Sequence, residues 1–274
     1  MTEETSPSCP DGAPGAGFCD GAMPLVVNHG HMSLPAFTWL SRIDTWVFDL
    51  DNTLYSAACD LWPKIDQRIT LFLGALSGLD GISSRALQKY YYERYGTTLR
   101  GLMEDYGVGP EDFLNFTHDI DRSSLLPDSA LSHAISALPG RKLILTNGSR
   151  EHALSTASAL GLEALFDAIF DITDANFVPK PAAETYDRFF GQHGIEPSRA
   201  VMFDDLARNL IIPHQRGMTT VLVVPGEGKA DHREAFETSH KEAMVFIDYV
   251  TSDLARFLNG LVVPRASAND VANR

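Results

Sequence analysis

Cysteine is scarce in this chain, and long hydrophobic runs are absent. The 274 residues include three cysteines, Cys9, Cys19 and Cys59, and no two of them form a Cys-x-x-Cys pair. This small, odd number argues against a disulfide framework and indicates a reducing compartment, so we expect a cytoplasmic protein. No apolar run approaches the roughly 20 residues that span a bilayer, and the first residues lack the basic start and apolar segment of a secretory signal. We therefore expect no membrane partner.

Basic residues are also in short supply. Lysine and arginine together number 22 against 36 aspartates and glutamates, which gives a formal net charge of -14 at pH 7. Because binding to a nucleic-acid polymer needs a positive surface, this balance argues against such a partner. A single phosphate-sized anion stays compatible with it wherever a lysine or a metal ion makes the field locally positive. The chain is long enough for a full core in one or two domains, and it carries no indication of an oligomeric state.

What the chain does contain is a short apolar run that ends in two carboxylates. Trp46, Val47 and Phe48 have the aromatic and β-branched character of a buried strand, and Asp49 and Asp51 follow at once. Side chains two apart in a strand point the same way, so both carboxylates should project from its carboxyl end, where open α/β sheets place their sites. Two close carboxylates repel unless a cation lies between them or one is protonated. Mg²⁺, which prefers oxygen ligands, meets that need.

This segment has two alternative interpretations. Acidic residues after a strand often only begin a turn or cap a helix. An EF-hand calcium loop fits poorly, because its sixth position is Leu54 instead of glycine, its twelfth is Asp60 instead of glutamate, and a strand precedes it.

Three later segments also contain polar residues suited to a phosphate site. The first, residues 141–149, ends in Thr146, Asn147 and Gly148 ahead of a predicted helix, an arrangement that offers a hydroxyl and backbone N–H groups to a phosphate. Next, Lys180 lies between two prolines, which stiffen its loop.

The last segment, residues 200–205, is an apolar strand that ends in Asp204 and Asp205. Each of the three has a plain alternative as a helix cap, a surface lysine or an acidic turn. The order of all four, three of them at strand ends, favours a single phosphate site.

This ordered set resembles the haloacid dehalogenase-like hydrolase superfamily from roughly Asp44 to Leu261. The resemblance implies an α/β fold: a doubly wound, Rossmann-like parallel sheet core with a small α-helical cap inserted after the first strand. It also implies a Mg²⁺-dependent reaction through an aspartyl-phosphate on a small-molecule phosphate ester. In that superfamily the residue matching Asp51 is a threonine in transport ATPases and is missing in dehalogenases, so phosphatase or phosphomutase remains.

The resemblance assigns a role to each matching residue. Asp49 is the nucleophile, and Asp51 is the general acid/base whose backbone carbonyl also binds the metal. Thr146, with Asn147 and Gly148, holds the phosphoryl group, and Lys180 neutralises its charge and that of the nucleophile. Asp204 and Asp205 complete the metal site, with Asp205 expected to bind the ion directly and Asp204 to support it or Lys180.

The domain boundaries follow from composition and from the long insertion. We expect an N-terminal extension over 1–34, a core formed by 35–55 and 125–262, a helical cap over 56–124, and a polar tail over 263–274. His29 and His31 in the extension could bind metal, but histidines in a loose tail are more often solvated.

Several segments resemble a narrower family, the pyrimidine 5′-nucleotidase group. They are Phe48–Tyr55, Ile65–Ile69, Tyr95–Leu102, His118–Asp121 and Ala207–His214. The resemblance implies hydrolysis of UMP or CMP, with Tyr95 and Arg100 of the cap binding substrate, although amphipathic tyrosines usually pack in a core.

Other interpretations stay open. Asp66, Arg68, His118 and His214 can equally be helix-face or loop residues. The substrate can be another small phosphate ester such as a sugar phosphate or phosphoglycolate. The chain can also be a phosphomutase, or a phosphate-binding protein without activity.

Overall fold

A computed structural model describes residues 25–26, 40–238 and 241–262 of the chain. Its centre is one seven-stranded sheet in the order β1-β7-β6-β5-β2-β3-β4, and every neighbouring pair is parallel. The strands are β1 (Leu25–Val26), β2 (Thr45–Phe48), β3 (Arg141–Leu145), β4 (Ala168–Phe170), β5 (Ala200–Asp204), β6 (Thr219–Val223) and β7 (Tyr249–Thr251).

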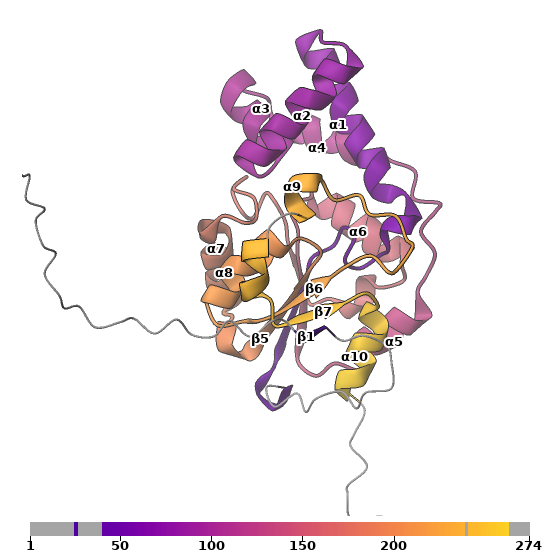
Figure 1. Ribbon diagram of the computed structural model, residues 1–274, viewed down its shortest axis with the longest axis vertical. Coiled ribbons are helices and arrows are strands. Elements are labelled where there is room, and N and C mark those ends of the chain that lie inside the picture. The colour runs from indigo at the N-terminus through magenta and orange to yellow at the C-terminus, as the bar shows by residue number, and fades with distance from the viewer. Residues whose placement is uncertain (1–24, 27–39, 239–240, 263–274) are drawn as a thin grey trace, which may run out of the picture.

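Both faces of the sheet are buried, because successive side chains of a strand enter two different cores. In β2, Trp46 and Phe48 pack on one side and Val47 packs on the other. The first face is covered by α5 (Ser129–Ser136), α6 (Arg150–Ala159) and α10 (Leu254–Val262), and the second by α7 (Ala183–His193) and α8 (Ala207–Gln215). Figure 1 shows these helices on either side of the sheet. The prediction of a doubly wound parallel α/β core is confirmed.

Four helices between β2 and β3 form the cap, which lies over the carboxyl ends of the strands (Figure 1). They are α1 (Leu61–Ser77), α2 (Gly81–Tyr95), α3 (Thr98–Tyr106) and α4 (Pro110–His118). The Asp80 side chain caps α2 by accepting hydrogen bonds from the backbone N–H groups of Ile82 and Ser83 at 2.9 and 3.0 Å. The cap has a core of its own, which includes Leu73, Tyr91, Leu99, Leu102, Phe113 and Leu114.

The remaining elements are short. They are the 3₁₀ turns Leu40–Arg42, Ala57–Cys59, Glu163–Leu165, Pro197–Arg199 and Lys241–Phe246, together with α9 (Ala235–Thr238) between β6 and β7. Figure 1 places α9 directly beneath the cap. Within the described part of the chain, none of the helices has the length and apolar character to cross a membrane.

The predicted N-terminal extension and C-terminal tail fall almost wholly outside the described residues. His29 and His31 lie there too. Inside the predicted extension, however, Leu25 and Val26 pair with Tyr249 and Val250 as an edge strand. The composition of the first residues gave no sign of this strand, because two residues are too few for a periodic pattern.

The contact between α2 and α3 leads to a first prediction. A Cβ atom on Gly101 would collide with the ring and Cβ of Tyr91, and Tyr91 is buried with its hydroxyl donating to Asp105 at 2.8 Å. We expect Gly101→Ala to lower the free energy of unfolding by about 1–3 kcal/mol through overpacking, measured by urea denaturation. Gly81→Ala is the matched control, since no atom lies within 4 Å of its Cβ position. Equal stability of the two variants would contradict the prediction.

Candidate active site

The predicted site residues come from four loops at one edge of the sheet. Asp49 follows β2, Thr146 follows β3, and Asp205 follows β5, while Lys180 lies on the loop after β4. Because β5, β2 and β3 are parallel neighbours, their carboxyl ends meet. The chain runs from β2 to β3 and β4 and then returns to β5 on the other side of β2, which makes this edge a topological switch point.

Lys180 is the positive centre of the site. Its side chain is buried, and its Nζ donates to Asp49 Oδ1 and to Asp204 Oδ2, both at 2.7 Å. Burial disfavours the ammonium, but the carboxylates of Asp204 and Asp49 outweigh it and raise the pKa of Lys180 above its ordinary value. The Asn147 side chain holds the lysine loop, since it accepts from Lys180 N at 2.8 Å and donates to Lys180 O at 3.2 Å. Asn147 therefore positions Lys180, and both polar atoms of its side chain are used in these two hydrogen bonds.

Three buried carboxylates surround that lysine. Oxygens of Asp49, Asp204 and Asp205 lie within 4.8 Å of one another. Asp204 is fully used, because its Oδ1 also accepts from Leu206 N and Asn209 Nδ2, both at 2.9 Å. In the described part of the chain, no hydrogen bond reaches the side chain of Asp205, so its oxygens are free for another partner.

The negative charge of this cluster would be stabilised by a further cation. Burial raises the pKa of Asp49 to about 7, although the Lys180 ammonium acts in the opposite direction. Burial, with the charges of Asp49 and Asp204, raises the pKa of Asp205 well above its ordinary value. One ammonium against three carboxylates leaves excess negative charge in a buried place, and an all-oxygen donor set suits a hard divalent ion. Asp49 and Asp205 are the residues that could hold it.

Asp51 has different partners. Its Oδ1 accepts from Tyr55 Oη at 2.6 Å and lies 2.9 Å from His152 Nε2. Burial alone would raise the pKa of Asp51, but the contact with His152 and the hydrogen bond from Tyr55 lower it to about 2. Neither His152 nor Tyr55 was predicted from the sequence as a partner of Asp51. The only available signal was a histidine in the first turn of the helix that follows the phosphate-type turn.

The turn after β3 has the geometry expected for holding an anion. Thr146 Oγ1 accepts from Gly148 N at 2.9 Å. A Cβ on Gly148 would lie 3.1 Å from His152 Cδ2 and 3.3 Å from Thr146 Oγ1, so a side chain here would be tight against both residues. Ser149 then caps α6 by accepting from His152 N at 3.2 Å. The turn thus places the Thr146 side chain next to a helix N-terminus, the end of a helix that favours phosphate.

A cavity of about 140 Å³ lies between these residues and the cap. Asp49, Asp51, Thr146 and Lys180 line its core side. Its cap side has an apolar wall of Trp62, Ile65, Ile69, Leu99, Phe113 and Leu114, and polar groups from Asp66, Gln88, Lys89, Tyr92, Thr97 and Thr98. The charged core side of the cavity matches a phosphate group, and its cap side matches a group with both apolar and polar surface.

Tyr95 and Arg100, which were expected to bind substrate, do not line this cavity. Tyr95 packs its ring 5.9 Å from that of Tyr91, and Arg100 pairs with Glu104 at 2.6 Å on the outside of α3. Tyr95 is the last residue of α2, and its ring packs against the core of the cap. The assignment of these two residues is corrected accordingly.

Of the four other candidate polar residues, two line the cavity and two do not. Asp66 and His118 line the cavity. Arg68 instead pairs with Asp119 at 3.3 Å, and His214 lies 3.5 Å from Asp248, both away from the cavity.

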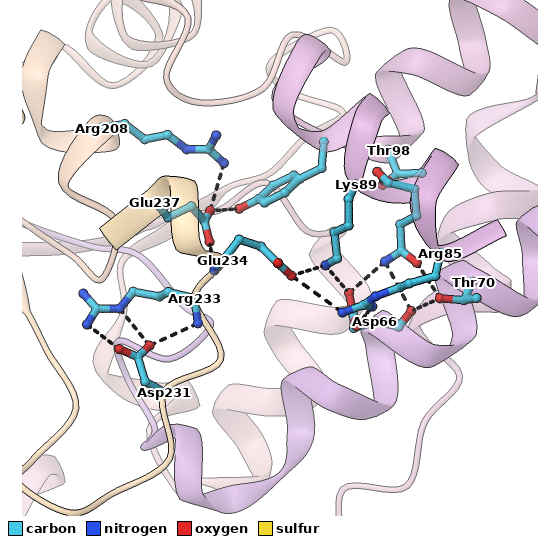
Figure 2. Close-up of polar contacts among 12 residues, drawn as sticks. Asp66, Thr70, Arg85, Lys89, Thr98, Arg208, Asp231, Arg233, Glu234 and Glu237 are labelled. Carbon is cyan, nitrogen blue, oxygen red and sulfur yellow. Dashed lines mark hydrogen bonds and ion pairs between the residues drawn. The ribbon is translucent and has the colours of Figure 1, made fainter. Parts of the chain in front are cut away.

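A core segment after β6 forms the far wall of the cavity, and Figure 2 shows how it meets the cap. Lys89 of α2 bridges Asp66 Oδ1 at 2.8 Å and Glu234 Oε1 at 2.6 Å. Tyr92 donates to Glu237, whose Oε1 also pairs with Arg208 at 3.2 Å. Sequence reasoning missed this segment because residues 225–238 carry no motif and little periodicity.

Comparison with known proteins agrees with this geometry. The family described as haloacid dehalogenase-like hydrolase matches residues 43–211. Phosphate metabolism protein 8 of Saccharomyces cerevisiae is 26% identical over 217 residues, which cover 73% of this chain and 67% of that protein. The crystal structure of a HAD phosphatase from Thermococcus onnurineus has a TM-score of 0.51 at 17% identity, and the match covers 81% of this chain and 100% of that one.

An L-2-haloacid dehalogenase from Xanthobacter autotrophicus gives a TM-score of 0.48 at 17% identity, covering 79% of this chain and 97% of that one. The likeness to the Thermococcus structure is one of fold. The family match extends over more than half of the chain and spans Asp49, Thr146, Lys180 and Asp205. The chain belongs to the haloacid dehalogenase-like hydrolase family.

Proposed function

We propose that this protein is a Mg²⁺-dependent phosphate monoester hydrolase that acts through an aspartyl-phosphate on pyrimidine nucleoside 5′-monophosphates. The observation that carries the hydrolase part is the buried cluster of Asp49, Lys180 and Asp205 with Asp51 beside it at one cavity. A dehalogenase needs no acid/base at the position of Asp51 and no metal cluster. The name of the yeast relative, a phosphate metabolism protein, agrees with phosphate chemistry.

In the first step a carboxylate oxygen of Asp49 forms a bond to phosphorus while the bond from phosphorus to the leaving oxygen breaks. Lys180 and the Thr146 hydroxyl bind the phosphoryl oxygens, where negative charge accumulates, and the Gly148 N–H holds the Thr146 oxygen in place. Asp51 gives its proton to the leaving oxygen. A Mg²⁺ ion held by Asp49 and Asp205 would offset the repulsion between the nucleophile and the phosphate.

In the second step water attacks the phosphorus of the aspartyl-phosphate. Asp51, now ionised, takes a proton from that water, and the phosphate and the Asp49 carboxylate separate. The low pKa of Asp51 keeps its carboxylate ionised, as the base role requires, and the approach of a negatively charged phosphoryl group raises that pKa for the acid role.

The cavity supports an uncharged leaving group. Every lysine and arginine that lines it in the described part of the chain already has a carboxylate partner: Lys89 has Asp66 and Glu234, Arg233 has Asp231, and Lys180 has Asp49 and Asp204. A second anionic group, as in phosphoglycolate, would find no unpaired cation. The aromatic wall of Trp62 and Phe113 suits the flat face of a pyrimidine.

The nucleophile is tested by Asp49→Asn. An amide is a poor nucleophile and a poor metal ligand, so we expect turnover of p-nitrophenyl phosphate to fall by at least about 10³-fold, below detection in most assays. EDTA should abolish the activity of the wild type, and added Mg²⁺ should restore it. Full activity in EDTA, or in the correctly folded variant, would refute the mechanism.

The acid/base is tested by Asp51→Asn, which keeps the backbone carbonyl but removes the proton donor. General acid catalysis contributes about 10²–10⁴-fold, so kcat/KM for UMP should fall by that order. The loss should be smaller for p-nitrophenyl phosphate, whose leaving group scarcely needs a proton. Equal losses on the two substrates would argue against leaving-group protonation by Asp51.

Selectivity is tested with a nucleotide panel and a cap variant. UMP and CMP should have higher kcat/KM than AMP and GMP, because a pocket that reads a pyrimidine rejects the larger purine sterically. Trp62→Ala should reduce kcat/KM for UMP by about 10-fold or more, as expected for a lost aromatic contact of about 1–3 kcal/mol, and p-nitrophenyl phosphate should change less. Tyr90→Ala is the control, since Tyr90 is an exposed aromatic of the same cap. A preference for a purine nucleotide or a sugar phosphate would refute the pyrimidine assignment.

A further inference from the structure

We propose that Arg122 and His152 are positioning residues that orient Asp51 for proton transfer and tie it to the connection that follows the cap; this inference rests on the proposed acid/base role of Asp51. None of the family motifs found in the sequence includes either residue. Their contacts form a continuous path from the connection that follows the cap to the carboxylate of Asp51.

Arg122 lies in the connection between α4 of the cap and α5 of the core, and it fastens that connection to α6. Its Nη1 donates to Ile120 O at 3.2 Å and its Nη2 to His118 O at 3.1 Å. Its Nε donates to Thr156 Oγ1 of α6 at 3.4 Å. Nη2 also lies 3.0 Å from His152 Nδ1. The guanidinium therefore holds both the returning chain and the histidine ring.

The contact with Arg122 fixes which nitrogen of His152 carries the proton. A guanidinium can only donate hydrogen bonds, so Nδ1 of His152 must be the acceptor and cannot carry a proton. The proton of the neutral ring is then on Nε2, which lies 2.9 Å from Asp51 Oδ1 and donates to it. The His152 side chain is fully buried, so no water competes for this position.

A second donor completes the orientation of Asp51. Tyr55 Oη donates to the same Oδ1 at 2.6 Å, and Tyr55 lies in the other connection, the one that leads from β2 into the cap. Two donors on Oδ1 fix the plane of the carboxylate and leave Oδ2 without a hydrogen-bond partner among the described residues. Oδ2 is thus the oxygen available to exchange a proton with the leaving group or with water.

A purely structural role for His152 predicts something different. Its ring stacks on that of His118 with a centroid distance of 4.4 Å, and loss of this packing alone would impair every substrate to the same degree. A positioning role impairs only the step that needs the proton. Leaving-group dependence therefore separates the two roles.

The experiment uses phenyl phosphate and p-nitrophenyl phosphate, which have similar size but leaving groups of very different acidity. In the full-length enzyme, His152→Leu removes the donor at similar volume, whereas His152→Gln keeps an N–H near the place of Nε2. We expect His152→Leu to lower kcat/KM for phenyl phosphate by about 10–100-fold, as is usual for residues that orient a catalytic group, and for p-nitrophenyl phosphate by less than about threefold. His152→Gln should recover most of the loss.

Arg122→Met provides a second, independent variant, because Arg122 is only half-buried and its loss leaves the core intact. Without the Arg122 guanidinium, the proton of His152 is free to move to Nδ1. We therefore expect Arg122→Met, too, to lose more activity on phenyl phosphate than on p-nitrophenyl phosphate, with little change in KM. Arg188→Met is the matched control, since Arg188 is an exposed arginine of α7, and it should behave like the wild type.

Two results would overturn the inference: equal losses on both substrates, or undiminished activity of folded His152→Leu or Arg122→Met on phenyl phosphate. If His152→Leu fails to fold by circular dichroism, Arg122→Met decides by the same criterion. The proposed function fails in another way, namely if the wild type hydrolyses neither ester or if Asp49→Asn keeps its activity.

Discussion

The structure depends on one electrostatic constraint, the confinement of three carboxylates around the buried ammonium of Lys180. Unpaired ions in a protein interior are strongly disfavoured, so Lys180 can lie there only because Asp49 and Asp204 each accept a hydrogen bond from it. Those two aspartates end β2 and β5, which pair directly. The pairing of β2 with β5 and the Asn147 contacts that hold the Lys180 loop keep this cluster together.

The cap adds a second layer of paired charges beside the cavity. Lys89 and Tyr92 of α2 are joined to Glu234 and Glu237 of the segment after β6. These contacts close one side of the cavity and pair the charges that face it. Under the proposed function, a substrate would therefore lie with its phosphate toward Asp49 and its neutral part toward the cap. Such alignment is the main way in which a protein assists phosphoryl transfer.

Sequence reasoning succeeded where chemistry and strand ends coincide. The strand before Asp49 and the strand that ends in Asp204 were predicted because an apolar run followed at once by carboxylates is a distinctive local pattern. Tyr95 was assigned wrongly because a run of tyrosines does not show which rings face a ligand and which pack in the core of the cap, where Tyr95 lies. His152, Arg122 and Glu234 could not be predicted, since each acts through a partner distant in sequence and none belongs to a local pattern.

The two connections between core and cap explain why those distant contacts matter. The chain leaves the core past Tyr55 and returns past Arg122, and both residues act on Asp51, one directly and one through His152. A change in the position of the cap must displace at least one of these connections. The orientation of the Asp51 carboxylate is therefore tied to both connections, and the proton transfer proposed for Asp51 depends on how the chain enters and leaves the cap.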